Sequence, residues 1–256
     1  NETVTLLQNA TFDTLPLSSG SVIVDLNGYT LTSVSGETSV IQNGANLTIQ
    51  DSKGTGTLVY NGFQDAAKAA FEVQKGSSIM LKNIRYNTTG TGVYAWGNAT
   101  TVNITDVDID SSGYCVGTNA GKTENYQVNI NITNSQLTSA LEGAGTAVLF
   151  NVPGTLNIDD STLNGHWQGL IARGGNITIS NSVITNTYDT LNANYEQAWG
   201  SGNAVTLAGI TIGNKGNNAY DYPVSIKLEN TSVTSIGPNP AIYVYQMTGD
   251  NRKVTV

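Results

Sequence analysis

Nine segments of the chain, two of them loosely, repeat one pattern of apolar and polar positions. Two apolar residues at alternate positions precede Asn, Asp or Gly, and another apolar residue follows three places later, as in Ile130, Ile132, Asn134 and Leu137. Alternation with a period of two predicts a strand with one buried face. The short polar residue predicts a bend, because Asn, Asp and Gly tolerate left-handed backbone angles. The bends are expected at Gly28, Asp51, Asn83, Asp106, Asn134, Asp160, Asn181, Gly209 and Asn230.

These repeats are too short to bury their own apolar faces, so we expect them to stack into one continuous core. The prediction is an all-β solenoid of about nine coils, forming a single domain over residues 1–256, with coils about 4.8 Å apart. Side chains at the bends would then lie beside their counterparts in the next coil and bond to them. The expected Asn/Asp ladder comprises Asp51, Asn83, Asp106, Asn134, Asp160, Asn181 and Asn230.

Several repeats resemble a known family. The stretches "INITNS", "LNIDDS", "ITISNS" and "VNITDV" look like coils of the right-handed, single-stranded parallel β-helix of the pectate-lyase-like superfamily. The stretches "VIVDLNGYTLTS" and "ANLTIQDSKGTGTL" resemble the first coils of bacterial cell-surface, adhesin-like members. The resemblance implies the fold. It leaves the activity open, because such folds host polysaccharide lyases, glycoside hydrolases, tailspikes and adhesin-like proteins.

A second column of apolar residues is obtained by counting ten residues back from the bends. The alternatives are an aromatic stripe that stacks sugar rings and a part of the core. We favour the core, because large apolar residues are usually buried. On this interpretation Tyr94 and Trp96 face inward and are not ligand residues. The column comprises Ile41, Val73, Trp96, Phe150, Ile171, Trp199 and Tyr220.

Charge and composition narrow the classes of function. Only 12% of residues are charged, and the net charge is −8. The acidic balance argues against nucleic acid and anionic membranes, both of which recruit basic patches. No apolar run is long enough to span a bilayer, so direct membrane insertion is not expected. The polar, Asn- and Thr-rich composition favours an exported protein, extracellular or at the cell surface, and we expect a monomer.

Three aspartates at alternate positions raise the possibility of a calcium site. Asp106, Asp108 and Asp110 have the spacing of the first ligands of a calcium loop, but the twelfth position is Gly117 rather than Glu. Val107 and Ile109 also have the alternation of a strand. We therefore favour one bend residue followed by two solvated carboxylates, and expect no cofactor, with Ca²⁺ as the alternative.

An adjacent pair of carboxylates, Asp159 and Asp160, invites comparison with glycoside hydrolases. Polygalacturonase-like members of the resembled superfamily carry such a pair, with a Gly-His-Gly motif about one coil away. Here His166 follows after only six residues, and Trp167 replaces the second Gly, so the register does not match. Arg173 is a candidate base of the kind used by lyases of this fold, although only 11 Lys and Arg residues argue against a polyuronate substrate.

The strongest local cluster of candidate residues is expected between 165 and 200, where one turn is long. Trp167 lies fourteen residues before Asn181, and Tyr195 lies fourteen before Gly209, so the two should stack in neighbouring coils. Long loops on a rigid scaffold often carry binding sites. The alternative is a loop that packs its own aromatic residues. The candidate ligand-binding residues are Trp167, Tyr188 and Tyr195, and the candidate catalytic residues are Asp159, His166, Arg173, Asp189 and Glu196.

Three functions are compatible with these patterns. The first is an exported, non-catalytic cell-surface β-helix whose loops bind a polysaccharide, a cell-surface glycan or a host surface. The second is a carbohydrate-active lyase or hydrolase that uses the cluster at 165–200, and the third is a structural stalk. Val254 and Val256 begin a further apolar pair, so we expect the natural protein to continue past residue 256 with another coil or a cap.

Overall fold

The computed structural model describes residues 2–63, 65, 68–119, 127–140, 145–190, 198–199, 203–204, 207–213 and 222–245. Within these residues all regular structure is β-strand, and no helix occurs. Apart from one short antiparallel pair, β21 (Ala198–Trp199) and β22 (Asn203–Ala204), the strands pair in parallel. The prediction of an all-β chain is therefore confirmed for this part of the chain.

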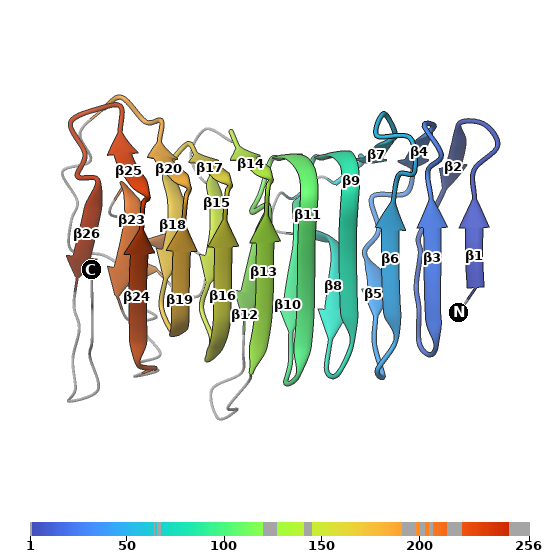
Figure 1. Cartoon of the computed structure of the whole chain (residues 1–256), viewed down its shortest axis with the longest axis horizontal. Coiled ribbons are helices and arrows are strands. Elements are labelled where there is room, and N and C mark those ends of the chain that lie inside the picture. The colour runs from blue at the N-terminus through green and yellow to red at the C-terminus, as the bar shows by residue number, and fades with distance from the viewer. Residues whose placement is uncertain are drawn as a thin grey trace.

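The strands stack in three rows. The first row follows one path through a large sheet, and its strands lie side by side along the long axis of the molecule (Figure 1). It consists of β1 (Glu2–Thr5), β3 (Ser21–Asp25), β6 (Asn46–Gln50), β9 (Ser78–Thr88), β11 (Thr100–Ser111), β13 (Val128–Thr133), β16 (Gly154–Asp159), β19 (Gly175–Ser180) and β24 (Val224–Glu229).

The second row belongs to the same large sheet and begins just after the bend in each coil. The long strands β9 and β11 run through the bend and contribute to both rows. The other strands of the second row are β2 (Ala10–Phe12), β4 (Thr30–Ser33), β7 (Thr57–Tyr60), β14 (Gln136–Ser139), β17 (Thr162–Gly165), β20 (Val183–Asn186) and β25 (Ser232–Ser235).

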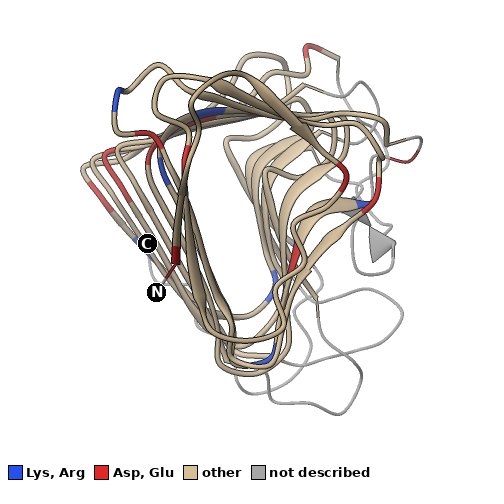
Figure 2. Ribbon diagram, turned by 90° about the vertical axis from the view of Figure 1, so that its right-hand side faces the viewer, with Lys and Arg blue, Asp and Glu red and all other residues tan. Residues whose placement is uncertain are grey.

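The third row is a separate sheet of eight parallel strands. Viewed along the stack, successive coils superimpose and outline a three-sided cross-section, one side for each row (Figure 2). This arrangement is that of a right-handed parallel β-helix, as predicted. The third row consists of β5 (Ser39–Ile41), β8 (Ala69–Gln74), β10 (Thr91–Trp96), β12 (Val116–Asn119), β15 (Thr146–Phe150), β18 (Gln168–Ala172), β23 (Ala208–Gly213) and β26 (Ile242–Tyr245).

The predicted bend residues turn the chain between the first and second rows. Left-handed backbone angles occur there, for example φ of 46° at Asn134 and 57° at Asp106. This conformation is sterically unfavourable for residues other than glycine, but least so for Asn and Asp. That explains why Asn and Asp recur at the bends. The same angles occur at Asn27, Asn83, Asp160, Asn181 and Asn230.

Two of the predicted bend residues need correction. Asp51 has no left-handed angle, which occurs instead at Gly54 in the turn between β6 and β7. Gly209 lies inside β23, a strand of the third row that pairs with β18 and β26. The first row passes directly from β19 to β24, with Ile177 opposite Ile226. The pattern Leu207, Gly209 and Ile212 was therefore an alternating strand of another row, not the strand that precedes a bend.

The core fills the space between the three rows. Inward residues of successive coils form columns in register, such as Ile104, Ile132 and Ile158, and all three are buried. Among the described residues, the largest fully buried side chains include Tyr60, Tyr86, Phe71 and Phe150. Each coil therefore stabilises its neighbours through one continuous apolar interior.

Candidate functional site

The side chains at the bends form short groups of contacts rather than one continuous ladder among the described residues. The Asn134 amide donates to a carboxylate oxygen of Asp106 at 2.5 Å, and the Asn83 amide donates to the main-chain oxygen of Asp51 at 2.7 Å. The Asn181 amide donates to Asp159, not to Asp160, at 2.9 Å. These bends are exposed or half-exposed, whereas Asp51 is buried.

The continuous internal stack is made of serines, which the sequence-based reasoning missed. The Ser161 hydroxyl accepts from the Ser135 main-chain N–H, and the Ser182 hydroxyl accepts from the Ser161 N–H, both at 3.1 Å. The Ser135 hydroxyl in turn accepts from the Val107 N–H. All three serines are buried. The sequence does contain a signal for this stack, because each serine directly follows a bend residue in "TNS", "DDS" and "SNS".

A second stack of amides lies on the outer face of the first row. The Asn131 amide donates to the Asn103 side-chain oxygen at 2.9 Å, and the Asn157 amide donates to that of Asn131 at 3.0 Å. The three residues are direct neighbours in register on β11, β13 and β16. These contacts order the polar surface of the helix between adjacent coils.

The three alternating aspartates do not form a metal cage with one another. Asp106, Asp108 and Asp110 are all exposed, and among the described residues no group of three or more His, Cys, Asp or Glu side chains is arranged to hold a metal ion. Partial burial, and then the charge of Asp108, raises the pKa of the Asp110 carboxyl. Calcium therefore remains an untested alternative with no geometric support in this part of the chain.

The adjacent carboxylates Asp159 and Asp160 differ in their surroundings. Hydrogen bonds from Ser180 and Asn181 lower the pKa of the Asp159 carboxyl and keep it ionised. Asp160 occupies the bend and is exposed. His166 follows the far end of β17, so the strand separates it from the carboxylates. The three residues therefore do not converge as an acid–base group.

The structure brings together part of the predicted cluster at 165–200. The rings of His166 and Tyr188 meet edge to face, 5.2 Å apart. The Nε2 atom of His166 is buried without a hydrogen-bond partner among the described residues, and Asp189 is exposed beside Tyr188. Trp167 is half-buried next to His166.

Other members of that cluster are separated from it or lie outside the described residues. Arg173 is fully buried and follows the opposite end of β18 from His166 and Trp167. Tyr195 and Glu196 lie outside the described residues. The equal offset that paired Tyr195 with Trp167 depended on a bend at Gly209, so that argument fails.

The outer face of the third row carries an aromatic pair that the sequence-based reasoning had assigned to the core. The rings of Tyr94 and Trp96 stack with centroids 6.4 Å apart and planes inclined by 24°. Both side chains are half-buried, whereas Val93 and Ala95, between and beside them, are fully buried. Tyr94 and Trp96 therefore face outward, and the prediction that they face inward is wrong.

Register explains where the remaining members of the predicted column lie. Ile41 and Val73 are inward neighbours, and Val73 pairs with Ala95 rather than Trp96. Phe150 is inward and pairs with Ala172, so Ile171 has the outward parity and packs with Leu149 and Tyr114 instead. Trp199 belongs to the short antiparallel pair, and Tyr220 lies outside the described residues.

Polar side chains and a glycine surround the aromatic pair. On one side, Glu72 and Gln74 are the register neighbours of Tyr94 and Trp96, and the Gln74 amide donates to Glu72 at 2.7 Å. On the other side, Gly117 and Asn119 occupy the matching positions of β12. A Cβ atom on Gly117 would lie only 2.9 Å from the Tyr94 ring, so the missing side chain is what admits the ring.

The hydroxyls of this face are held in their neutral form. Burial is the main cause that raises the pKa of Tyr94 far above its usual value, opposed by a hydrogen bond with Asn119. Burial also raises the pKa of Tyr114 to about 12, opposed by the charge of Arg173. At neutral pH the face therefore offers neutral aromatic rings with the carboxylate of Glu72 beside Tyr94.

No protein-family model, curated protein or solved structure matches the chain. Among the described residues no helix is long and apolar enough to cross a membrane. The observed fold is a parallel β-helix, and the polar and aromatic groups described above lie on the outer faces of its rows.

Proposed function

We propose that the protein is an exported, non-catalytic β-helix of the cell surface that binds a glycan on the outer face of its third row. The observation that carries the proposal is the stacked pair Tyr94 and Trp96, which lie half-exposed on the outer face of the third row. Aromatic residues with one accessible face supply large contact areas at small entropic cost, and they dominate binding energies where they occur.

The surroundings of the pair match the chemistry of a sugar. A pyranose ring presents a face of C–H groups, which packs on an aromatic ring, and a rim of hydroxyls, which needs donors and acceptors. Glu72 and Gln74 supply acceptors and a donor on one side, and Asn119 supplies an amide on the other. The carboxylate of Glu72 and the net charge of −8 favour a neutral over an anionic glycan.

A binding role rather than catalysis is supported by the positions of four of the candidate acids and bases within the described part of the chain. Asp159 and Asp160 precede β17, His166 follows it, and Arg173 is buried beyond β18. General acid–base catalysis needs its groups within hydrogen-bond reach of one reacting bond. The exported, surface location rests on the polar composition and is tested by labelling intact cells that express the natural protein.

The proposal is tested on a glycan array with the parent protein and the double variant Tyr94→Ala, Trp96→Ala. We expect the parent to bind a neutral glycan and the double variant to lose binding. The double variant should still fold cooperatively, with a lower melting temperature because the two half-buried rings are removed. Tyr29→Ala is the matched control, because Tyr29 is exposed on a different coil.

Each other outcome identifies an alternative. Binding that survives in the double variant would contradict the site, and no binding to any glycan would favour a stalk. Release of reducing ends or of unsaturated sugars would show that the protein is an enzyme.

A further inference from the structure

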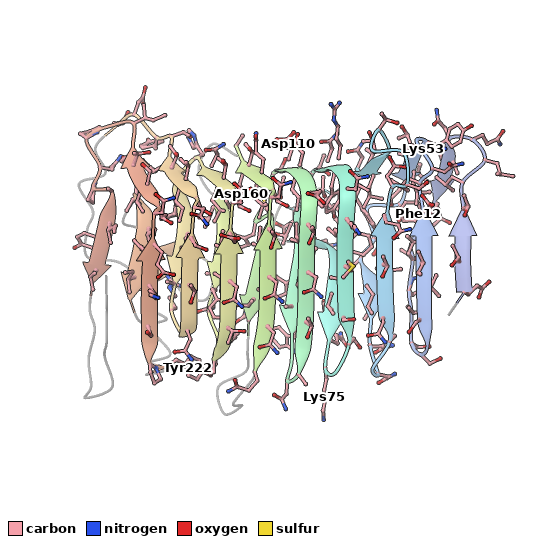
Figure 3. All side chains as sticks on the ribbon, viewed as in Figure 1. Phe12, Lys53, Lys75, Asp110, Asp160 and Tyr222 are labelled. Atoms are coloured by element: carbon pink, nitrogen blue, oxygen red, sulfur yellow. The ribbon has the colours of Figure 1, made fainter. Side chains whose placement is uncertain are left out.

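A polar groove runs along the bends between the first and second rows, on a different side of the helix from the aromatic pair. Its volume is about 470 Å³. The side chains that line it come from successive coils, and Asp160 lies near the upper ends of the first-row strands in Figure 3. The lining residues that matter here are Arg85, Asp106, Asp108, Asn134, Gln136 and Asp160.

The groove has the periodicity of the helix. Asp106, Asn134 and Asp160 occupy equivalent bends in three successive coils, which are about 4.8 Å apart. The Asn134 amide donates to Asp106, so the central residue holds its neighbour in place. The groove therefore presents carboxylate, amide and carboxylate along its length, at intervals similar to the length of one sugar ring.

The charges in the groove are unequal. Three carboxylates and one guanidinium line the groove, and the ion pair between Lys227 and Glu229 lies elsewhere. Arg85 is the register neighbour of Asp108 on β9 and β11, yet the two form no ion pair. An excess of negative charge thus remains, which attracts a cationic ligand and repels an anionic one.

We propose that this groove binds an extended, cationic chain of amino sugars. Protonated amines two rings apart would meet Asp108 and Asp160 in charge-assisted hydrogen bonds. The amides of Asn134 and Gln136 would bond to the ring hydroxyls. This groove is a separate site from the aromatic pair on the third row. It binds a cationic ligand, whereas the aromatic site binds a neutral one.

A sugar chain fits this groove better than a basic peptide. A peptide that binds an extended groove usually adds a strand to a free sheet edge. The strands beside this groove have no free edge, because β11 pairs with β9 on one side and with β13 and β14 on the other. The apolar residues in the lining, Ile84 and Val107, are buried and form no pocket for peptide side chains.

The test measures binding of a glucosamine hexasaccharide at mildly acidic pH, where the amines of the sugar are protonated. The double variant Asp108→Asn, Asp160→Asn keeps the shape of both side chains and removes their charges. Asn also tolerates the left-handed backbone angle at position 160. We expect binding by the parent that weakens with salt, and a loss of about tenfold for each carboxylate removed. A control variant, Glu2→Gln with Asp13→Asn, removes two exposed charges outside the groove.

The other results are each decisive. Equal loss in the control variant would reduce the effect to net charge, and equal binding of the fully N-acetylated hexasaccharide would remove the role of the amine. Stronger binding of oligolysine, lost in the same double variant, would assign the groove to a peptide. The variant Tyr94→Ala, Trp96→Ala should bind the glucosamine chain normally, so this proposal and the proposed function can fail separately.

Discussion

The side-chain amide of Asn230 donates a hydrogen bond to the side-chain oxygen of Asn181, 2.9 Å away, although 49 residues separate the two in the chain. Their strands, β24 and β19, pair in register over their whole length. The segment between them contains β20 and β23, which keep their places in the second and third rows. The greater length of this coil therefore does not change which coils are neighbours. Loops of variable length can be accommodated in this way because each coil contacts only the next.

We predict that Asn134→Leu destabilises the protein more than Asn134→Gly does. Both variants lose the bond to Asp106, but leucine must also adopt the left-handed angle at this bend, at an added cost of about 1–2 kcal/mol, whereas glycine adopts it readily. Chemical denaturation of the three proteins gives the comparison. Equal free energies of unfolding for the two variants would show that backbone conformation does not explain Asn134.

Asp51 should make the protein sensitive to acid. Burial raises the pKa of its carboxyl, but N–H groups of Gly56, Gly28 and Thr55 donate to it and together hold the pKa below its usual value. The stabilisation is therefore present above the unfolded pKa of about 3.9, and it is lost as the pH falls through the lower folded pKa.

The variant Asp51→Asn should cost about 1–3 kcal/mol at neutral pH, because one acceptor becomes a donor facing N–H groups. Denaturant unfolding over a range of acid pH should show a weaker pH dependence for this variant than for the parent. Asp13→Asn, at an exposed position, serves as the control. A pH dependence unchanged by Asp51→Asn would assign the acid sensitivity to other carboxyls.

Removal of one hydroxyl from the internal serine stack should be costly. The Ser161 hydroxyl accepts from the Ser135 N–H and donates to the main-chain oxygen of Asp159. Ser161→Ala leaves the buried N–H without its partner, at an expected cost of about 1–3 kcal/mol. Thermal melts should show a clear loss for this variant and little for Ser232→Ala, which is exposed. Similar melts for both would mean that the stack does not stabilise the coils.

Gly117→Ala should disturb the aromatic site without replacing an aromatic residue. The added methyl would lie 2.9 Å from the Tyr94 ring and 3.4 Å from the Tyr114 ring, so the Tyr94 ring must shift. If the proposed glycan site is right, affinity should fall about tenfold or more, while overpacking costs about 1–3 kcal/mol of stability. Affinity and melting temperature are measured on the same preparation. Unchanged affinity would contradict a role for Tyr94.

The sequence predicted the bends better than it distinguished the rows. The alternation before Asn134 and Asp160 identified first-row strands, because a left-handed residue after such a strand has few alternatives. The same alternation occurs in every row, so the third-row strand around Gly209 matched the pattern equally well. Nothing in the periodicity alone separates a strand that precedes a bend from one that does not.

One extra residue in the turn after β10 explains why Tyr94 and Trp96 were wrongly predicted to face inward. Val73 lies ten residues before Asn83, but its inward counterpart Ala95 lies eleven before Asp106. The turn after β10 contains the extra residue, with left-handed angles at Gly97 and Ala99. A shift of one residue exchanges the two faces of a strand, so a fixed count assigned Trp96 to the interior.

The amide stack on the first row has a direction. Each later coil donates to the earlier one, from Asn157 to Asn131 and from Asn131 to Asn103, so the amide dipoles align head to tail. The N–H end of the series meets Met80, which offers no oxygen, and the carbonyl end meets Thr178, whose hydroxyl can donate. The outer surface is therefore electrically polar along the axis, even where it carries no net charge.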